Sequence, residues 1–181
     1  MRVIAGEARG RRLKVPSTSR LRPTSDLIRG VIFDMLAARE ADLSRVLDLY
    51  AGTGALGIEA LSRGAQWCDF VEQNAAACAT IRRNLALAGF AERAKVYHWS
   101  AAQALHRLPG EYTLVLADPP YRDEGALAVM NKLASSPLLL EQAIIVYEHA
   151  KELAPPPLLG RFRPSASRRH GSTCVSIYQL E

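Results

Sequence analysis

Short apolar runs and helical patterns alternate along most of the chain, and this alternation limits the possible folds more than any other feature. The apolar runs are residues 45–50, 66–72, 94–99, 112–117 and 143–149. The helical patterns between them are residues 54–63, 74–88, 100–107 and 123–134. Segments 160–164 and 173–180 have the pattern of a closing antiparallel pair. We therefore expect an α/β fold, with a mostly parallel seven-stranded sheet, helices on both faces and an antiparallel C-terminal strand.

The N-terminal residues have a different pattern. Segments 2–6 and 11–15 flank the short connection 7–10 and predict a small β-hairpin, and 17–23 predicts a linker. Thr24 is a suitable N-cap for a helix. The inner side of that helix is predicted to carry Leu27, Ile28, Val31, Ile32, Met35 and Leu36. We expect a basic hairpin and linker over residues 1–23 and a single main domain over residues 24–181.

Composition narrows the class of protein. The chain has 181 residues, of which 49% are hydrophobic and 23% charged, as expected for one globular domain with a small appendage. The sequence predicts neither a membrane span nor a secretory signal, so we expect a cytoplasmic protein. Three cysteines without C-x-x-C spacing predict neither a disulfide framework nor a metal site.

The positive charge is concentrated at the two ends of the chain. Residues 1–30 carry eight Arg or Lys against two acids, whereas residues 31–160 carry 11 basic and 15 acidic side chains. A second cluster at 161–171 adds four arginines without an acid. Basic ends on an acidic body favour RNA or DNA as a partner over a merely solvated surface. The candidate RNA-binding residues are Arg2, Arg9, Arg11, Arg12, Lys14, Arg20, Arg22, Arg168 and Arg169.

A glycine-rich segment, "DLYAGTGALGIEA" at 48–60, joins the first core strand to the next helix. Gly52, Gly54 and Gly57 form a G-x-G-x-x-G pattern, and Glu72 follows Gly52 by twenty residues, where a ribose-binding acid is expected. A nicotinamide oxidoreductase is therefore one interpretation. Asp48 favours another, because a carboxylate there repels a pyrophosphate but suits the ammonium group of S-adenosyl-L-methionine.

The strand at 112–117 ends in "DPPY", Asp118 to Tyr121. The two prolines predict a stiff extended segment at the carboxyl ends of the strands, where ligands bind in such sheets. The Asp118 carboxylate and the Pro119 carbonyl could accept the N–H groups of an exocyclic amine and direct its lone pair at a methyl donor. Tyr121 offers an aromatic face to a base rotated out of its stack.

The carboxylate also bears on the target base. Guanine presents adjacent N1–H and N2–H donors that one carboxylate accepts side by side, whereas an Asn amide matches adenine better. Asp118 therefore favours guanine, and adenine remains the alternative.

"DLYAGTGALGIEALSRGA" followed by "LADPPY" resembles the Rossmann-like methyltransferases that use adenosylmethionine. With "MRVIAGEARGRRLKVP" and "LRPTSDLIRGVIFDML", the chain is similar to the RsmD family, which methylates guanine N2 in 16S ribosomal RNA. The resemblance implies a methyltransferase domain over 24–181 and a 16S RNA substrate, free or within a 30S subunit or assembly intermediate. It implies donor contacts by Asp48, Tyr50, Ala51, Gly52, Thr53, Gly54, Glu72, Gln73, Ser100, Ala101 and Asp118. It places the target base at Asp118, Pro119, Pro120 and Tyr121.

The chain departs from the family pattern at three places. Gly30 stands where the family has Glu, the turn at Ala101 lacks an acid or Asn, and His170 stands for Tyr. Other interpretations are an amine methyltransferase acting on adenine or a protein amide, a nicotinamide oxidoreductase, and a catalytically silent RNA-binding module.

Overall fold

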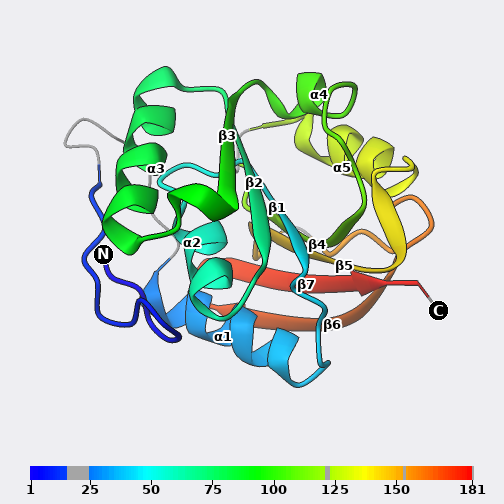
Figure 1. Ribbon diagram of the computed structural model, residues 1–181. Helices are drawn as coiled ribbons and strands as arrows, with labels where there is room; N and C mark the ends of the chain where they lie inside the picture. Colours follow the sequence, from blue (N-terminus) through cyan, green and yellow to red (C-terminus); the bar gives the residue numbers. More distant parts are fainter. Residues whose placement is uncertain (16–24, 121–122, 153, 181) are drawn as a thin grey trace.

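The computed structural model describes residues 1–15, 25–120, 123–152 and 154–180 (Figure 1). Its centre is a seven-stranded sheet with the order β3-β2-β1-β4-β5-β7-β6. The strands are β1 Arg45–Leu49, β2 Trp67–Glu72, β3 Ala94–His98, β4 Tyr112–Ala117, β5 Leu139–Ala150, β6 Arg163–His170 and β7 Thr173–Gln179. Strands β1 to β5 are parallel to one another, and β7 pairs antiparallel with both β5 and β6. The predicted α/β class, with its seven-stranded sheet and antiparallel C-terminal strands, is confirmed.

Helices cover both faces of this sheet (Figure 1). They are α1 Asp26–Ala37, α2 Ala55–Ser62, α3 Ala75–Ala88, α4 Ala101–Ala104 and α5 Ala126–Ala134, with a short 3₁₀ helix at Ala91–Arg93. Successive strand residues point to opposite faces, so Val46 packs with α1, α2 and α3, and Leu47 packs with α4 and α5. Because both faces are covered, most positions of the central strands β1 and β4 are apolar and buried.

Several predicted boundaries shift, for local reasons. β6 runs from Arg163 to His170, beyond the predicted 160–164, because the basic segment pairs with β7 along its length. The helix predicted over 123–134 begins at Ala126, since the Asp123 carboxylate accepts a hydrogen bond from the Gly125 N–H and closes a turn first. The helix predicted over 100–107 is regular only over Ala101–Ala104.

Helix α1 forms as predicted, with two differences. Ser25 is the N-cap and accepts a hydrogen bond from the Ile28 N–H, whereas Thr24 lies outside the described residues. Leu27 is 63% exposed, so its predicted inward position is wrong. The inner side instead includes Arg29, which is fully buried and donates to the Asp26 carboxylate and the Arg2 carbonyl.

The β-hairpin predicted for the N-terminal arm, residues 1–15, is not shown as a pair of regular strands. Its two halves pair over a short stretch: an antiparallel bridge joins Arg2 and Arg12, and the N–H groups of Val3 and Leu13 donate to the Arg11 and Met1 carbonyls. Other N–H groups of the arm bind side chains of α2, since the backbone N–H groups of Ile4 and Ala5 donate to the Glu59 carboxylate. These side chains satisfy donors that a hairpin ladder would otherwise use. The arm therefore pairs with itself over only a short stretch and docks onto α2.

In the described part of the chain, no helix is long and apolar enough to cross a membrane. Cys68, Cys78 and Cys174 are all free thiols.

Candidate active site

The turn from β1 into α2 has three glycines with two different uses. A Cβ on Gly57 would come within 2.4 Å of the Phe70 ring, so this glycine allows α2 to pack closely on the sheet. Gly52 has a φ of 55°, and a Cβ there would meet no atom within 4 Å. Gly52 therefore faces open space, as a residue approached by a ligand should.

Asp48 lies behind this turn. Its side chain is 1% exposed, and its Oδ2 accepts the Gly57 N–H at 2.8 Å. Burial raises the pKa of Asp48 to about 7; the Gly57 hydrogen bond lowers it, and the charges of Asp118 and Glu72 raise it further. The carboxylate thus ties β1 to α2 directly beneath the site.

A cavity of about 860 Å³ opens at the carboxyl ends of the parallel strands. The predicted site residues that line it are Tyr50, Gly52, Glu72, Gln73, Ser100, Ala101, Asp118 and Pro120. Five predicted residues do not line it, namely Asp48, Ala51, Thr53, Gly54 and Pro119. Tyr121 lies outside the described residues. The cavity also includes residues that we did not predict: Val71, Asn74, Ala76, Ala77, Trp99, Ala102, Asp123, Gly125 and Val129.

Glu72 ends β2 at one side of the cavity. One carboxylate oxygen accepts the Gly52 N–H at 2.8 Å, and the other accepts the Asn74 N–H at 2.7 Å. These bonds fix the side chain while leaving each oxygen a second lone pair. A half-buried carboxylate held in this way can accept hydrogen bonds from two neighbouring hydroxyls, as on a ribose.

Tyr50 marks the end of β1. It has a φ of 76°, which is uncommon for a residue with a side chain and typical of functional turns. Its phenolic oxygen is buried and has no hydrogen-bond partner among the described residues. Burial raises the pKa of Tyr50, with the Asp123 and Tyr147 charges adding to it, so the hydroxyl stays protonated. A buried donor beside a cavity is ready for a ligand acceptor.

Asp118 directly follows β4, the strand next to β1 in the sheet. Leu49 pairs with Ala117, and these are the last residues of β1 and β4. The residues that follow them, Tyr50 and Asp118, therefore lie at neighbouring strand ends. The Pro120 carbonyl accepts the Asp123 N–H at 2.8 Å and leads the chain toward α5. The strand register therefore brings Asp118 into the cavity that contains Gly52 and Glu72.

Residues that follow β3 form another wall of the cavity. Ser100 caps α4 in a reciprocal arrangement, because its hydroxyl accepts the Gln103 N–H and its own N–H donates to the Gln103 side chain. This cap fixes Ala101 and Ala102 at the cavity. Neither residue contributes a polar side chain, so at these two positions the backbone supplies the polar groups.

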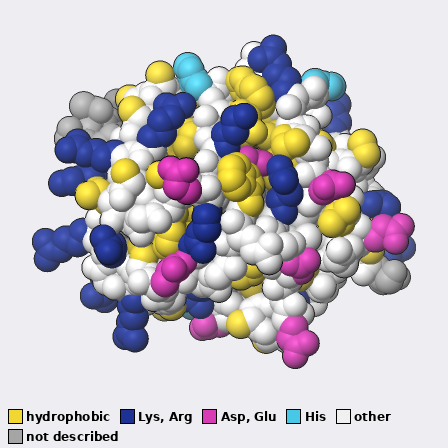
Figure 2. Space-filling model, viewed as in Figure 1, with side chains coloured by type: hydrophobic (Ala, Val, Ile, Leu, Met, Phe, Trp, Pro, Cys, Tyr) yellow, Lys and Arg dark blue, Asp and Glu magenta, His cyan; other side chains and the backbone are white. Residues whose placement is uncertain are grey.

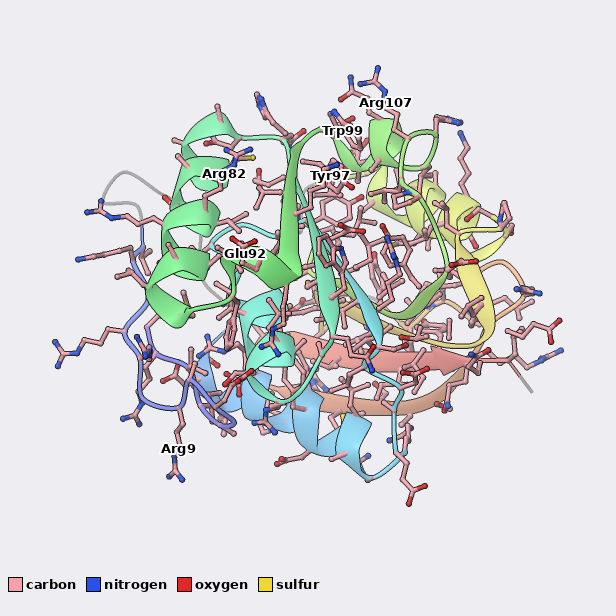
Figure 3. The ribbon with its side chains drawn as sticks, in the orientation of Figure 1. Arg9, Arg82, Glu92, Tyr97, Trp99 and Arg107 are labelled. Carbon is pink, nitrogen blue, oxygen red and sulfur yellow. The ribbon has the colours of Figure 1, made fainter. Side chains whose placement is uncertain are left out.

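The basic candidates lie away from the cavity. Arg9, Arg12 and Lys14 are exposed on the arm, and Figure 3 shows Arg9 extending away from the body. Figure 2 shows Lys and Arg side chains gathered on the side of the molecule where the arm lies in Figure 1. Arg11 is exposed but donates to the Leu87 carbonyl at 2.9 Å, and Arg2 pairs with Asp26 at 3.7 Å.

The second basic cluster is on the edge strand β6, where Arg168 and Arg169 are exposed. Arg20 and Arg22 lie outside the described residues. The two described basic regions are thus on separate elements.

Some missed cavity residues had a signal in the sequence. Asn74 closely follows the strand-end acid Glu72, and Trp99 directly follows a strand, so both stand where strand ends build sites. Val129 had none, because an apolar residue inside a helix gives no indication of facing a cavity.

Known proteins resemble this chain along its whole length. The family model described as "Conserved hypothetical protein 95" matches residues 1–179. YlbH of Bacillus subtilis is 37% identical over 99% of this chain and 98% of its own length. The "Ribosomal RNA small subunit methyltransferase D" of Escherichia coli is 33% identical, covering 100% of this chain and 90% of the relative.

Solved structures agree with these matches. The Escherichia coli yhhF structure has a TM-score of 0.88 at 33% identity and covers 100% of this chain and 98% of that one. An RNA methyltransferase from Salinibacter ruber, solved in complex with S-adenosyl-L-homocysteine, has a TM-score of 0.64 at 18% identity over 88% and 94% of the chains, a likeness of fold alone. The full-length family match and the full-length relatives lead to one conclusion: this chain belongs to the RsmD family of rRNA methyltransferases.

Proposed function

We propose that the protein transfers a methyl group from S-adenosyl-L-methionine to the exocyclic N2 amine of a guanine in 16S ribosomal RNA. The observation that carries the proposal is a single cavity that joins the turn at Gly52, the carboxylate of Glu72 and the segment that begins at Asp118. One end suits a nucleoside donor, and the other suits an amine acceptor.

The residues present fit this donor. Glu72 would hold the ribose hydroxyls, and Gly52 and Tyr50 would border its methionine part. Gln73 and the turn at Ser100 and Ala101 would border the adenine. Asp48 would contribute to donor binding from beneath the cavity, since its negative charge favours a cationic ligand there. When bound, the donor supplies an electrophilic methyl group on a positively charged sulfur.

Asp118 and Pro119 prepare the acceptor. The Asp118 carboxylate and the Pro119 carbonyl would accept N–H groups of the guanine amine, which orients the nitrogen lone pair toward the methyl group. The N–C bond forms as the C–S bond breaks, and a neutral thioether leaves. Positive charge then develops on nitrogen, where the carboxylate stabilises it and stands ready to accept the released proton.

The choice of guanine rests on the carboxylate. Asp118 offers two acceptor oxygens to the adjacent N1–H and N2–H donors of guanine, whereas adenine presents an acceptor at N1. Tyr121 would supply a face for the base. The basic arm and the linker to residue 23, together with Arg168 and Arg169, would contact phosphates, and residues 24–181 would form the methyltransferase domain.

The test uses small ribosomal subunits from a strain that lacks the activity. We expect the protein and labelled donor to place label on one guanine of 16S RNA, mapped by nuclease digestion and mass spectrometry. Free 16S RNA tested in parallel shows whether the assembled subunit is needed. Label on adenine or on a ribosomal protein would contradict the proposed target. Binding of NAD with no binding of adenosylmethionine would contradict the reaction class.

A further inference from the structure

We infer that Trp99 is a specificity-determining residue for the donor, with its indole edge contacting the adenine ring. This inference rests on the proposed use of adenosylmethionine and extends it to a residue that the glycine turn and the D-P-P-Y segment do not include. Trp99 lines the cavity together with Ser100, Ala101 and Ala102.

The indole lies in a stack of two aromatic rings with a cationic side chain next to each ring. The Tyr97 and Trp99 rings lie 4.4 Å apart with an angle of 27° between their planes. The Arg107 guanidinium lies 5.5 Å from the Trp99 ring centre, and the Lys95 ammonium lies 5.1 Å from that of Tyr97. Figure 3 shows Tyr97, Trp99 and Arg107 in that order near the end of β3. Stacking on Tyr97 and the cation–π contact with Arg107 restrain the indole, and the Lys95 contact restrains Tyr97.

The stack determines which part of Trp99 is available to a ligand. A ring separation of 4.4 Å leaves no space for a guanidinium between Tyr97 and Trp99, so Arg107 occupies the opposite indole face. With both faces covered, Trp99 presents its edge to the cavity. The positive edge of one aromatic ring attracts the negative face of another, so this edge suits the face of a purine.

The strand order determines which end of the donor lies there. Glu72 pairs with His98, the residue before Trp99, across the β2–β3 ladder. On the other side of β2 lies β1, followed by β4 with Asp118 at its end. A nucleoside with its ribose on Glu72 and its methyl group near Asp118 therefore extends its base toward β3 and Trp99.

The chain offers a matched control for a spectroscopic test, because Trp67 and Trp99 are its two tryptophans. Trp67 begins β2, at the opposite end of that strand from Glu72, and its indole N–H donates to Asp69. The variant Trp67→Phe leaves Trp99 as the fluorescent indole. The variant Trp99→Phe leaves Trp67, which is remote from the cavity.

The experiment titrates both variants with S-adenosylhomocysteine, which carries the adenine but no transferable methyl group, and calorimetry measures binding in parallel. We expect saturable emission changes in Trp67→Phe and none in Trp99→Phe. Adenosine alone should reproduce the Trp99 response, and methionine alone should not. Trp99→Ala should weaken S-adenosylhomocysteine binding about tenfold, and Trp99→Phe less, since it keeps an aromatic edge.

Two results separate this inference from the proposed function. Binding of S-adenosylhomocysteine by calorimetry without a change in Trp99 emission would overturn the inference and leave the proposed function standing. Absence of binding to the unsubstituted protein would overturn both. Equal affinities of Trp99→Ala and the parent would also overturn the inference. Arg107→Ala, a change in a positioning residue, should alter the Trp99 spectrum of the unliganded protein and weaken binding two- to threefold.

Discussion

The strand-end site and the N-terminal arm are held in place by different contacts. At the site, the N–H groups of Tyr50 and Ala51 both donate to the Val71 carbonyl, and neighbouring strands set the positions of the turns. The arm instead depends on side chains from helices: Glu59 and Ser62 of α2 and Asn84 of α3 bind its backbone. The site is fixed by the sheet itself, whereas the arm is fixed by a few buried polar groups.

The two regions nevertheless meet at Asn84. Its amide oxygen accepts the Lys14 N–H at 2.7 Å, and its amide nitrogen donates to the carbonyls of Lys14 and Thr53, each at 3.0 Å. Val3 and Leu13 of the arm are also buried in the core that contains α1, α2 and α3. The arm is therefore packed against the glycine turn, and changes in either region can be designed to test how far they act separately.

The largest expected effect is in the site. Asp118→Ala should lower the rate of methyl transfer a hundredfold or more, because an oriented acceptor contributes about 3 kcal/mol at the transition state. Binding of the donor, measured by calorimetry, and binding of RNA should change far less. Asp118→Asn keeps one acceptor oxygen and should lose less activity. An active Asp118→Ala protein would rule out the proposed chemistry.

The next effect concerns how the arm is held. Glu59→Ala leaves the N–H groups of Ile4 and Ala5 and the Arg63 guanidinium without their buried acceptor. We expect the free energy of unfolding to fall by about 2 kcal/mol, and the arm to become sensitive to trypsin. Urea unfolding measures the first and timed digestion the second.

Glu59→Gln, which keeps one acceptor oxygen, is the matched control and should show a smaller loss. If Glu59→Ala matches the parent in both measurements, the arm does not depend on this carboxylate.

The third effect removes charge from the arm while leaving its backbone contacts with Glu59, Ser62 and Asn84 in place. Replacing Arg9, Arg11, Arg12 and Lys14 with Ala should weaken RNA binding about tenfold at physiological salt and flatten its dependence on salt by roughly one unit of log–log slope per lost contact at most. Donor binding should persist. The changes Lys132→Ala and Lys151→Ala, which remove charge elsewhere, are the control. An unchanged salt slope would exclude the arm as the RNA-binding element.

The smallest expected effect is the change in folding stability with pH that Asp48, beneath the cavity, causes. Because burial raises the pKa of Asp48 from 3.8 to about 7, the unfolded chain loses this proton at a lower pH than the folded protein does. Stability contributed by protonated Asp48 is therefore complete below pH 3.8, declines up to about pH 7 and then levels off.

Asp48→Asn keeps an acceptor for the Gly57 N–H but does not titrate. Relative to this variant, the parent should lose at most about 1.4 kcal/mol of stability per pH unit between pH 5 and 7, measured by urea unfolding. A constant difference between the two proteins across that range would contradict a raised pKa.

The sequence alone supported the sheet, its parallel core and eight of the 17 residues that line the cavity. Alternating apolar patterns are local, and so are the turn preferences of Gly52 and of the prolines after Asp118. The position of Glu72 followed from its spacing after Gly52 together with the rule that ligands bind at the carboxyl ends of parallel strands. Leu27 was misplaced because a short apolar periodicity continues into an exposed first turn.

Tertiary structure decided what depends on residues far apart in the chain. Glu59 meets Ile4 across 55 positions, and Asn84 meets Lys14 across 70, so no local pattern indicated that the arm would bind helices in addition to pairing briefly with itself. The cavity beside Trp99 likewise exists because β3, β1 and β4 end at one edge of the sheet. Periodicity determines the elements, because backbone preference and apolar spacing act over a few residues. Strand register and buried polar partners determine which side chains meet, because those contacts form only when the elements pack.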